Sequence, residues 1–213
     1  MLAMVRVALQ AVRPVPLPNG ASLLPSLEVG VRHDGGDAET GFGLEVGAGL
    51  SWNDPQRGIT AEVKGRSLLT HVDEEFREQG LALAFAWDPA PSNRGPALAL
   101  SHTMGSAAEG GMAALLAPTV LEGVDGPAGN GQRFNAELAY GFPVANDRLT
   151  LTPALAVALS PDSSAYSLRW SLAPYSPHGH AAPWQLSIEA QRQEHNTPTP
   201  PDHSLKLSLS LLF

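Results

Sequence analysis

The sequence predicts an all-β protein, an antiparallel up-and-down transmembrane β-barrel of about 12 strands, of which eleven can be counted. Apolar and polar residues alternate along most of the chain, and a period of two is the side-chain period of a β-strand. Only 16% of the residues are charged, against about 25% in soluble domains. No apolar run approaches the ~20 residues that a membrane-spanning helix needs. These observations leave two classes, a soluble β-sheet protein and a barrel whose outer face contacts lipid.

Length and composition limit the architecture and the chemistry. The chain has 213 residues, which we assign to one domain over residues 1–213. It contains no Cys, which excludes disulfide scaffolds and thiolate sites. Its net charge is −8 and its Lys and Arg are scattered singly, which argues against a nucleic-acid partner. Its seven His are not spaced as a ligand cluster, so we expect neither a metal ion nor a cofactor.

Six strands are expected in the first half of the chain, each with one apolar face and one polar or small face. Turn residues such as Pro-Asn-Gly at 18–20 and Asn-Asp-Pro at 53–55 separate them. The apolar faces, in order, carry Val5, Val7 and Leu9; Leu27, Val29 and Val31; Phe42, Leu44, Val46, Leu50 and Trp52; Ile59, Ala61 and Val63; Leu81, Leu83, Phe85 and Trp87; and Leu98 with Leu100.

Five more strands follow the long Gly-rich connection 107–131. Their apolar faces carry Phe134, Leu138, Tyr140 and Phe142; Leu149, Leu151, Leu155, Val157 and Leu159; Tyr166, Leu168, Trp170 and Leu172; Trp184, Leu186, Ile188 and Ala190; and Leu205, Leu207, Leu209, Leu211 and Phe213. Most strands would span roughly 10–13 residues, against about 5–6 in soluble sheets.

Alternation alone does not separate a soluble β-sandwich from a membrane barrel. A sandwich buries the apolar face against a second sheet, whereas a barrel turns that face toward lipid. Strand length favours the barrel, since about 9–11 residues are needed to cross a bilayer at a tilt. The polar rows are also rich in Gly, Ala and Ser, which suit the crowded interior of a narrow barrel.

The last strand ends on an aromatic residue, Phe213. In a soluble protein, the terminal LKLSLSLLF would be an exposed apolar edge and an aggregation hazard. In an outer-membrane protein, it matches the expected assembly signal, polar-x-Gly-x-x-apolar-x-aromatic. Lys206, Ser208, Leu211 and Phe213 take those places, and Ser208 replaces the Gly.

These segments resemble a known family. PSLEVGVRHDGGDAETGFGLEVGAGL, AELAYGFPV and the terminal strand are similar to autotransporter-type outer-membrane β-barrel domains at the C-termini of large bacterial surface proteins. The resemblance covers nearly the whole chain and is strongest over 25–52. It implies an outer-membrane barrel, without catalysis, that anchors and exports an N-terminal passenger. The implied partners are outer-membrane lipid, the barrel-assembly machinery and periplasmic chaperones during insertion, and a passenger segment in the lumen.

Placing the C-terminus in the periplasm, as in other outer-membrane barrels, assigns every connection. Residues 34–39, 73–78, 107–131, 160–164 and 193–203 become extracellular, and 14–21, 53–58, 88–95, 144–148 and 176–182 become periplasmic turns. Trp52, Trp87, Phe142 and Trp184 then form an aromatic girdle at the periplasmic ends of their strands. An extra strand within 107–131 would move Trp52 and Trp87 to the opposite end. Because barrels of this kind have an even strand number, eleven strands lead us to expect a chain truncated before its first strand.

Charged residues form a row on the polar faces of the predicted strands. They are Glu28, Arg32, Glu45, Glu62, Lys64, Arg66, Glu137, Arg169 and Glu189, together with Arg6 and Lys206. Because buried charges persist only when they are paired, two interpretations stay open. The row is either a salt-bridged plug in a narrow lumen or a polar channel around a passenger segment.

Two groups of residues invite an outer-membrane hydrolase as the alternative. His33, Asp34 and Asp37 lie at a predicted strand end, but no second pair of Asp opposes them, and an Asp-Gly turn accounts for them. Ser101 and His102 are neighbours on one strand, so their side chains point to opposite faces and cannot form a nucleophile–base pair. His178 and His180 lie two residues apart in a short turn and invite weak, adventitious metal binding, but solvated turn residues are the simpler interpretation. No catalytic residue is therefore predicted.

Overall fold

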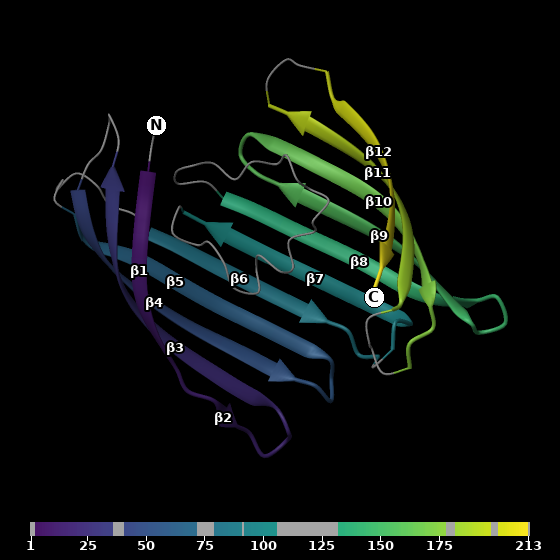
Figure 1. The fold of residues 1–213 in the computed structure, drawn as a ribbon, viewed down its shortest axis with the longest axis horizontal. Coiled ribbons are helices and arrows are strands. Elements are labelled where there is room, and N and C mark those ends of the chain that lie inside the picture. The colour runs from purple at the N-terminus through teal and green to yellow at the C-terminus, as the bar shows by residue number, and fades with distance from the viewer. Residues whose placement is uncertain are drawn as a thin grey trace.

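The computed structural model describes residues 3–35, 41–71, 79–90, 92–105, 132–177, 182–196 and 200–212. Within them the chain forms 12 β-strands and no helix (Figure 1). The strands are β1 (Ala3–Val12), β2 (Val15–Pro16), β3 (Ser22–Gly35), β4 (Gly41–Asp54), β5 (Ile59–His71), β6 (Gln79–Trp87), β7 (Gly95–Met104), β8 (Gln132–Val144), β9 (Leu149–Leu159), β10 (Ser163–Pro174), β11 (Trp184–His195) and β12 (Asp202–Leu211). In these residues no helix has the length and apolarity to cross a membrane.

All strands belong to one antiparallel sheet, and its order confirms the predicted up-and-down fold. The order is β1-β3-β4-β5-β6-β7-β8-β9-β10-β11-β12, and β2 pairs with β3 beside this path. The eleven long strands are those expected from the alternation. The two-residue β2, in the connection expected at 14–21, was not expected, because two residues show no periodicity. β7 and β8 are hydrogen-bonded neighbours, with Met104 opposite Gln132, so no strand lies between them in the sheet.

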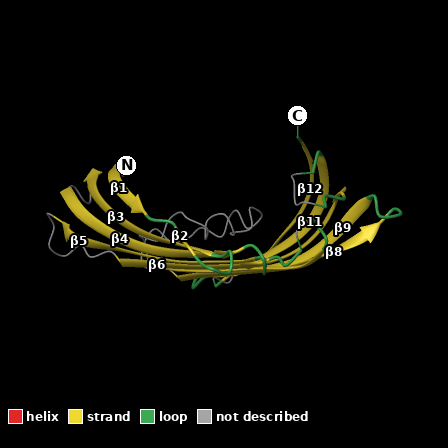
Figure 2. Cartoon of the chain, turned by 90° about the horizontal axis from the view of Figure 1, so that it is seen from below, coloured by secondary structure: helices red, strands yellow, loops and turns green. Residues whose placement is uncertain are grey.

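The sheet is strongly curved and open. Figure 2 shows a trough whose two sides rise at β1–β3 and at β11–β12. β1 and β12 are its two edges, so the predicted barrel is observed as an unclosed sheet. A physical reason lies in the strand number. Because eleven antiparallel strands alternate in direction, β1 and β12 run the same way and cannot close the sheet with an antiparallel pair.

In strands such as β4 and β9, exposure alternates along the strand in the opposite sense from that of a soluble protein. In β9, Leu155 is 60% exposed, while Ala154 and Ala156 on the other face are 4% and 8% exposed. The same face as Leu155 carries Leu27, Val29, Leu138 and Ile188, all more than 40% exposed. Among the described residues, the buried apolar side chains are alanines apart from Leu68. Large apolar groups therefore lie on the exposed face, and small or charged groups on the buried face.

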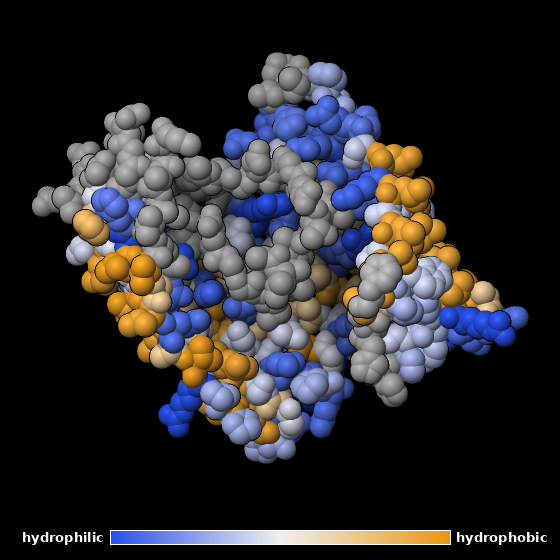
Figure 3. Space-filling model, viewed as in Figure 1, coloured by the Kyte–Doolittle hydropathy of each residue, from blue (hydrophilic) through white to orange (hydrophobic). Residues whose placement is uncertain are grey.

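The curvature explains which face is buried. Side chains on the inside of a curved sheet crowd one another, whereas those on the outside spread apart. Figure 3 is viewed toward the hollow: hydrophilic residues are visible in it between the residues drawn in grey, and hydrophobic residues lie along the outer margins. We call these surfaces the concave face and the convex face. Small residues suit the concave face, as Ala158 and Ala165 show with no exposure at all.

Candidate functional site

Six residues of the predicted charged row form three ion pairs on the concave face. On the side of β3, β4 and β5, an oxygen of Glu28 lies 3.4 Å from Arg66, although β4 separates their strands. Both residues are in register with Gly47 of β4. A Cβ at Gly47 would lie 3.4 Å from the Cβ of Glu28. The missing side chain at position 47 therefore leaves room for Glu28 and Arg66 to meet above β4.

A second pair on the same side is more deeply buried. Arg32 of β3 lies 3.6 Å from Glu45 of β4, and their side chains are only 8% and 4% exposed. Each is opposite a glycine in the register, Gly43 for Arg32 and Gly30 for Glu45. A buried charge needs a partner to offset the loss of hydration, so the pair and its flanking glycines form one structural unit.

The other side of the trough has a corresponding arrangement across β9. Arg169 of β10 contacts Glu137 of β8 at 2.5 Å. The β9 residues in register with them are Ala154 and Ala156, whose short side chains leave space for the contact. Here too, a small residue on the middle strand allows a charged pair to form across it.

Glu189 continues this row toward the edge of the sheet. It lies opposite Arg169 on β10 and opposite Lys206 on β12. Glu189 is 5% exposed, and its Oε1 is buried with no hydrogen-bond partner among the described residues. A polar cavity of about 240 Å³ adjoins it, lined by residues that include Ser187 and Ser210. Lys206, its register partner on β12, is exposed.

Between the two charged sides lies a strip of small and uncharged residues on β6 and β7. Ala82 and Ala84 are 3% and 6% exposed. Ser101 accepts a hydrogen bond of 3.0 Å from Nδ2 of Asn135. Glu62 and Lys64 of β5 border the strip, in register with Ala84 and Ala82. The concave face therefore consists of two charged bands with a neutral strip between them.

The four predicted girdle residues lie at one end of the sheet, on the convex face. Trp52 and Trp87 are at the C-terminal ends of β4 and β6, Phe142 is near the end of β8, and Trp184 begins β11. A second aromatic band, which was not predicted from the sequence, lies at the opposite end of the sheet. Its members are Phe42, Phe134 and Tyr166, which are 65%, 37% and 46% exposed. Each lies an even number of residues from the apolar residues of its own strand, so it shares their face. A search of the sequence for aromatic residues at both ends of the predicted strands would have found them.

The predicted assembly signal is described only in part. Lys206, Ser208 and Leu211 lie on β12, where Ser208 shares a 2.8 Å hydrogen bond with Ser187 and Leu211 is opposite Trp184. Phe213 lies outside the described residues. β12 contributes one of the two open edges of the sheet.

The residues weighed as catalytic have other contacts. Ser101 is held by Asn135 on the concave face, whereas His102 packs edge-to-face on Phe134 on the convex face, with ring centroids 6.2 Å apart. The two side chains therefore lie on opposite faces, as the alternation predicts. His33 stacks on Phe42 at 4.4 Å, while Asp37, His178 and His180 lie outside the described residues.

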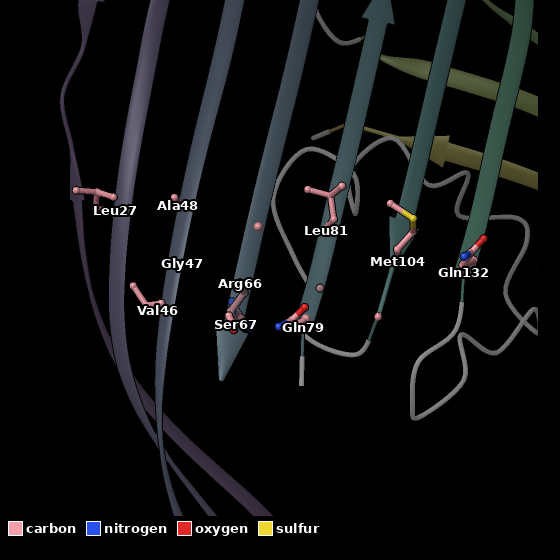
Figure 4. Close-up of a pocket in the computed structure, with 13 residues that line it drawn as sticks. Leu27, Val46, Gly47, Ala48, Arg66, Ser67, Gln79, Leu81, Met104 and Gln132 are labelled. Atoms are coloured by element: carbon pink, nitrogen blue, oxygen red, sulfur yellow. The ribbon is translucent and has the colours of Figure 1, made fainter. Parts of the chain in front are cut away.

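Other sites are few in the described part of the chain. No three His, Asp or Glu residues there are grouped so that they could hold a metal ion. Partial burial raises the pKa of the Asp88 carboxyl in the β6–β7 connection, although a backbone hydrogen bond from Ala90 opposes this. The convex face has a depression of about 730 Å³ beside Gly65, between Leu27 and Leu81 (Figure 4).

Comparison with known proteins adds no assignment. No family model matches the chain, and no curated protein or solved structure is significantly similar to it.

Proposed function

We propose that this protein is an integral outer-membrane β-barrel that anchors a passenger segment at the bacterial surface and takes part in its export, without catalysis. One observation carries the proposal, the inverted exposure of the sheet. In the middle of the sheet Leu155 is 60% exposed and Leu138 is 56% exposed, while Glu45 and Arg32 on the other face are 3% and 7% exposed. Water does not favour this distribution, since it leaves apolar surface hydrated and charges dehydrated. Lipid around the convex face removes the first cost.

The distance between the two aromatic bands matches the height of the apolar band in outer-membrane barrels. Phe42 and Trp52 lie on the convex face near the two ends of β4, ten residues apart. At ~3.3 Å per residue they are about 33 Å apart along the strand. A strand tilt of 35–45° reduces this to about 25 Å along the membrane normal, which is the height of the apolar band in outer-membrane barrels.

The concave face supports an anchor role more than a charge-selective pore. Its pairs Arg32–Glu45, Glu28–Arg66 and Glu137–Arg169 each join one cation to one anion, so each is neutral as a unit. The neutral strip that includes Ala82 and Ala84 between the charged bands is where a passenger segment would meet least electrostatic resistance. The passenger role itself rests on the resemblance of the sequence to autotransporter-type barrels.

The alternatives are less well supported. A soluble sandwich needs a second sheet on the apolar face, and the described strands form one sheet. A hydrolase needs a nucleophile beside a base, and Ser101 and His102 occupy opposite faces.

Expression behind a bacterial signal peptide tests the proposal. We expect the protein in the outer-membrane fraction, resistant to a carbonate wash, with a mobility on denaturing gels that changes on boiling. Depletion of the assembly machinery should reduce the folded form. Recovery of a folded, monomeric, detergent-free protein from the periplasm would refute the proposal.

A further inference from the structure

The connection between β6 and β7 reaches farther than a hairpin turn needs to. Asn93 comes two residues before β7, yet its Nδ2 donates a 2.8 Å hydrogen bond to the carbonyl oxygen of Pro174, the last residue of β10. The backbone N–H of Ser176 donates to Oδ1 of Asn93 at 3.2 Å. β8 and β9 lie between β7 and β10 in the sheet. Asn93 therefore bridges two strands to bind the start of the β10–β11 connection.

Arg94 fixes the same segment to the β8–β9 turn. Its Nη2 donates to the carbonyl oxygen of Asp147 at 2.8 Å, and its Nη1 contacts the Asp147 carboxylate at 3.2 Å. Its guanidinium lies 3.8 Å from the centre of the Tyr175 ring, a cation–π contact. Three connections at the Trp87 end of the sheet are thus joined through two adjacent residues.

Gly141 shows that this segment crosses the concave face. A Cβ at Gly141 would lie 2.2 Å from the backbone oxygen of Asn93, so only glycine permits the crossing. Gly141 lies between Tyr140 and Phe142, which are 46% and 47% exposed on the convex face, and it therefore points the other way. Thr150, which is 1% exposed, donates to Oδ1 of Asn93 at 3.1 Å.

A cavity lies beneath the segment. It has a volume of about 280 Å³ and is bounded by Asn93 and Arg94 together with concave-face residues that include Ala97, Ala139 and Thr152. Asn93 and Arg94 therefore cover part of the concave face at one end of the sheet. An ordinary turn would instead extend away from the sheet.

We propose that Asn93 and Arg94 form a latch that constricts the lumen at the periplasmic mouth, and that passage through the barrel requires its release. The inference rests on the proposed function, since a mouth exists only in a membrane-inserted barrel. It adds a defined constriction, held by side-chain hydrogen bonds that can break while the strand ladder stays intact. The substrate class it controls is an ion or an extended polypeptide segment entering from the periplasm.

Removal of the latch is the first test. We expect Asn93→Ala combined with Arg94→Ala to raise the single-channel conductance of the protein in planar bilayers severalfold. Arg57→Ala is the matched control, because it removes a cation from another turn at the same rim. The Arg57 side chain is 67% exposed and contacts Asp54 of its own turn, so this variant should conduct like the wild type.

A reversible lock is the second test. The chain contains no Cys, so Asn93→Cys with Ser176→Cys introduces a single thiol pair. The two residues lie side by side, since the backbone N–H of Asn93 also contacts the carbonyl oxygen of Ser176 at 3.4 Å. We expect the oxidised variant to conduct less than its reduced form, and reduction to restore conductance. Each single-Cys variant, treated with the same oxidant, controls for effects of oxidation alone.

The outcomes separate the latch from the proposed function. A wild-type protein that fails to insert, with no heat-modifiable form, overturns the proposed function and the latch together. If the double Ala variant and the oxidised double Cys variant both insert normally and conduct like the wild type, the latch alone is overturned. A rise on latch removal together with a fall on locking supports it.

Discussion

Replacing Leu155 by Arg measures directly what surrounds the convex face. Leu155 lies in the middle of β9, with Leu138 and Leu168 opposite it on the neighbouring strands, and it is 60% exposed. If water covers this face, Arg at an exposed position changes the free energy of unfolding by no more than about 0.5 kcal/mol. If lipid covers it, Arg near the bilayer midplane costs about 2–4 kcal/mol.

A depth series makes the expectation more specific. Leu159 lies on the same face, four residues toward the end of β9, and is 41% exposed. Because the cost of a charge falls to about 0–1 kcal/mol near the membrane interface, Leu159→Arg should be much milder than Leu155→Arg. Leu155→Met keeps an apolar side chain of similar volume and should stay close to the wild type.

The assay is reversible unfolding by urea of protein refolded into lipid vesicles. Tryptophan fluorescence and the heat-dependent gel shift report the folded fraction, and linear extrapolation gives the free energy of unfolding. A Leu155→Arg variant as stable as the wild type would refute the membrane assignment. Equal losses at positions 155 and 159 would refute the depth argument.

Three further predictions concern assembly, depth and the charged face. Deleting Phe213 should block assembly into the outer membrane in cells, as judged by loss of the heat-modifiable form. Normal assembly of this variant would show that Phe213 is not part of the assembly signal. In single-tryptophan variants, lipids labelled near the headgroup should quench Trp87 more than Trp170, which lies farther from the strand end; equal quenching would contradict the girdle. Glu137→Ala should lower the free energy of unfolding by about 1.5–3 kcal/mol, and the effect should largely disappear in an Arg169→Met background. Strict additivity in that double-mutant cycle would show that the contact contributes little.

The strands of this fold could be predicted from the sequence because their signal is local. The alternation of Leu205, Leu207 and Leu209 with Lys206 and Ser208 assigns each residue to one of two faces without any knowledge of the neighbouring strands. Short connections then favour pairing of consecutive strands. β2 could not be predicted in this way, because its two residues, Val15 and Pro16, are too few to show an alternation.

The sequence could predict which charged residues share the concave face, but not which of them pair with one another. That Glu28 and Arg66 share a face follows from their parity. That they pair with each other across β4 follows from the register, which places Gly47 between them. Likewise, Asn93 carries no pattern that would distinguish it from any other turn residue. Its role depends on Gly141 and Pro174, which come much later in the chain.

By itself the sequence determined the strands, the two faces of each strand and the end of the sheet at which Trp52 and Trp184 lie, because all three depend on a period of two and on chain direction. Only the tertiary structure decided that Leu155 is exposed while Glu45 is buried. Alternation states that two faces differ, but burial depends on what packs against each face. Here that is set by the curvature of one sheet and the absence, among the described residues, of a second layer.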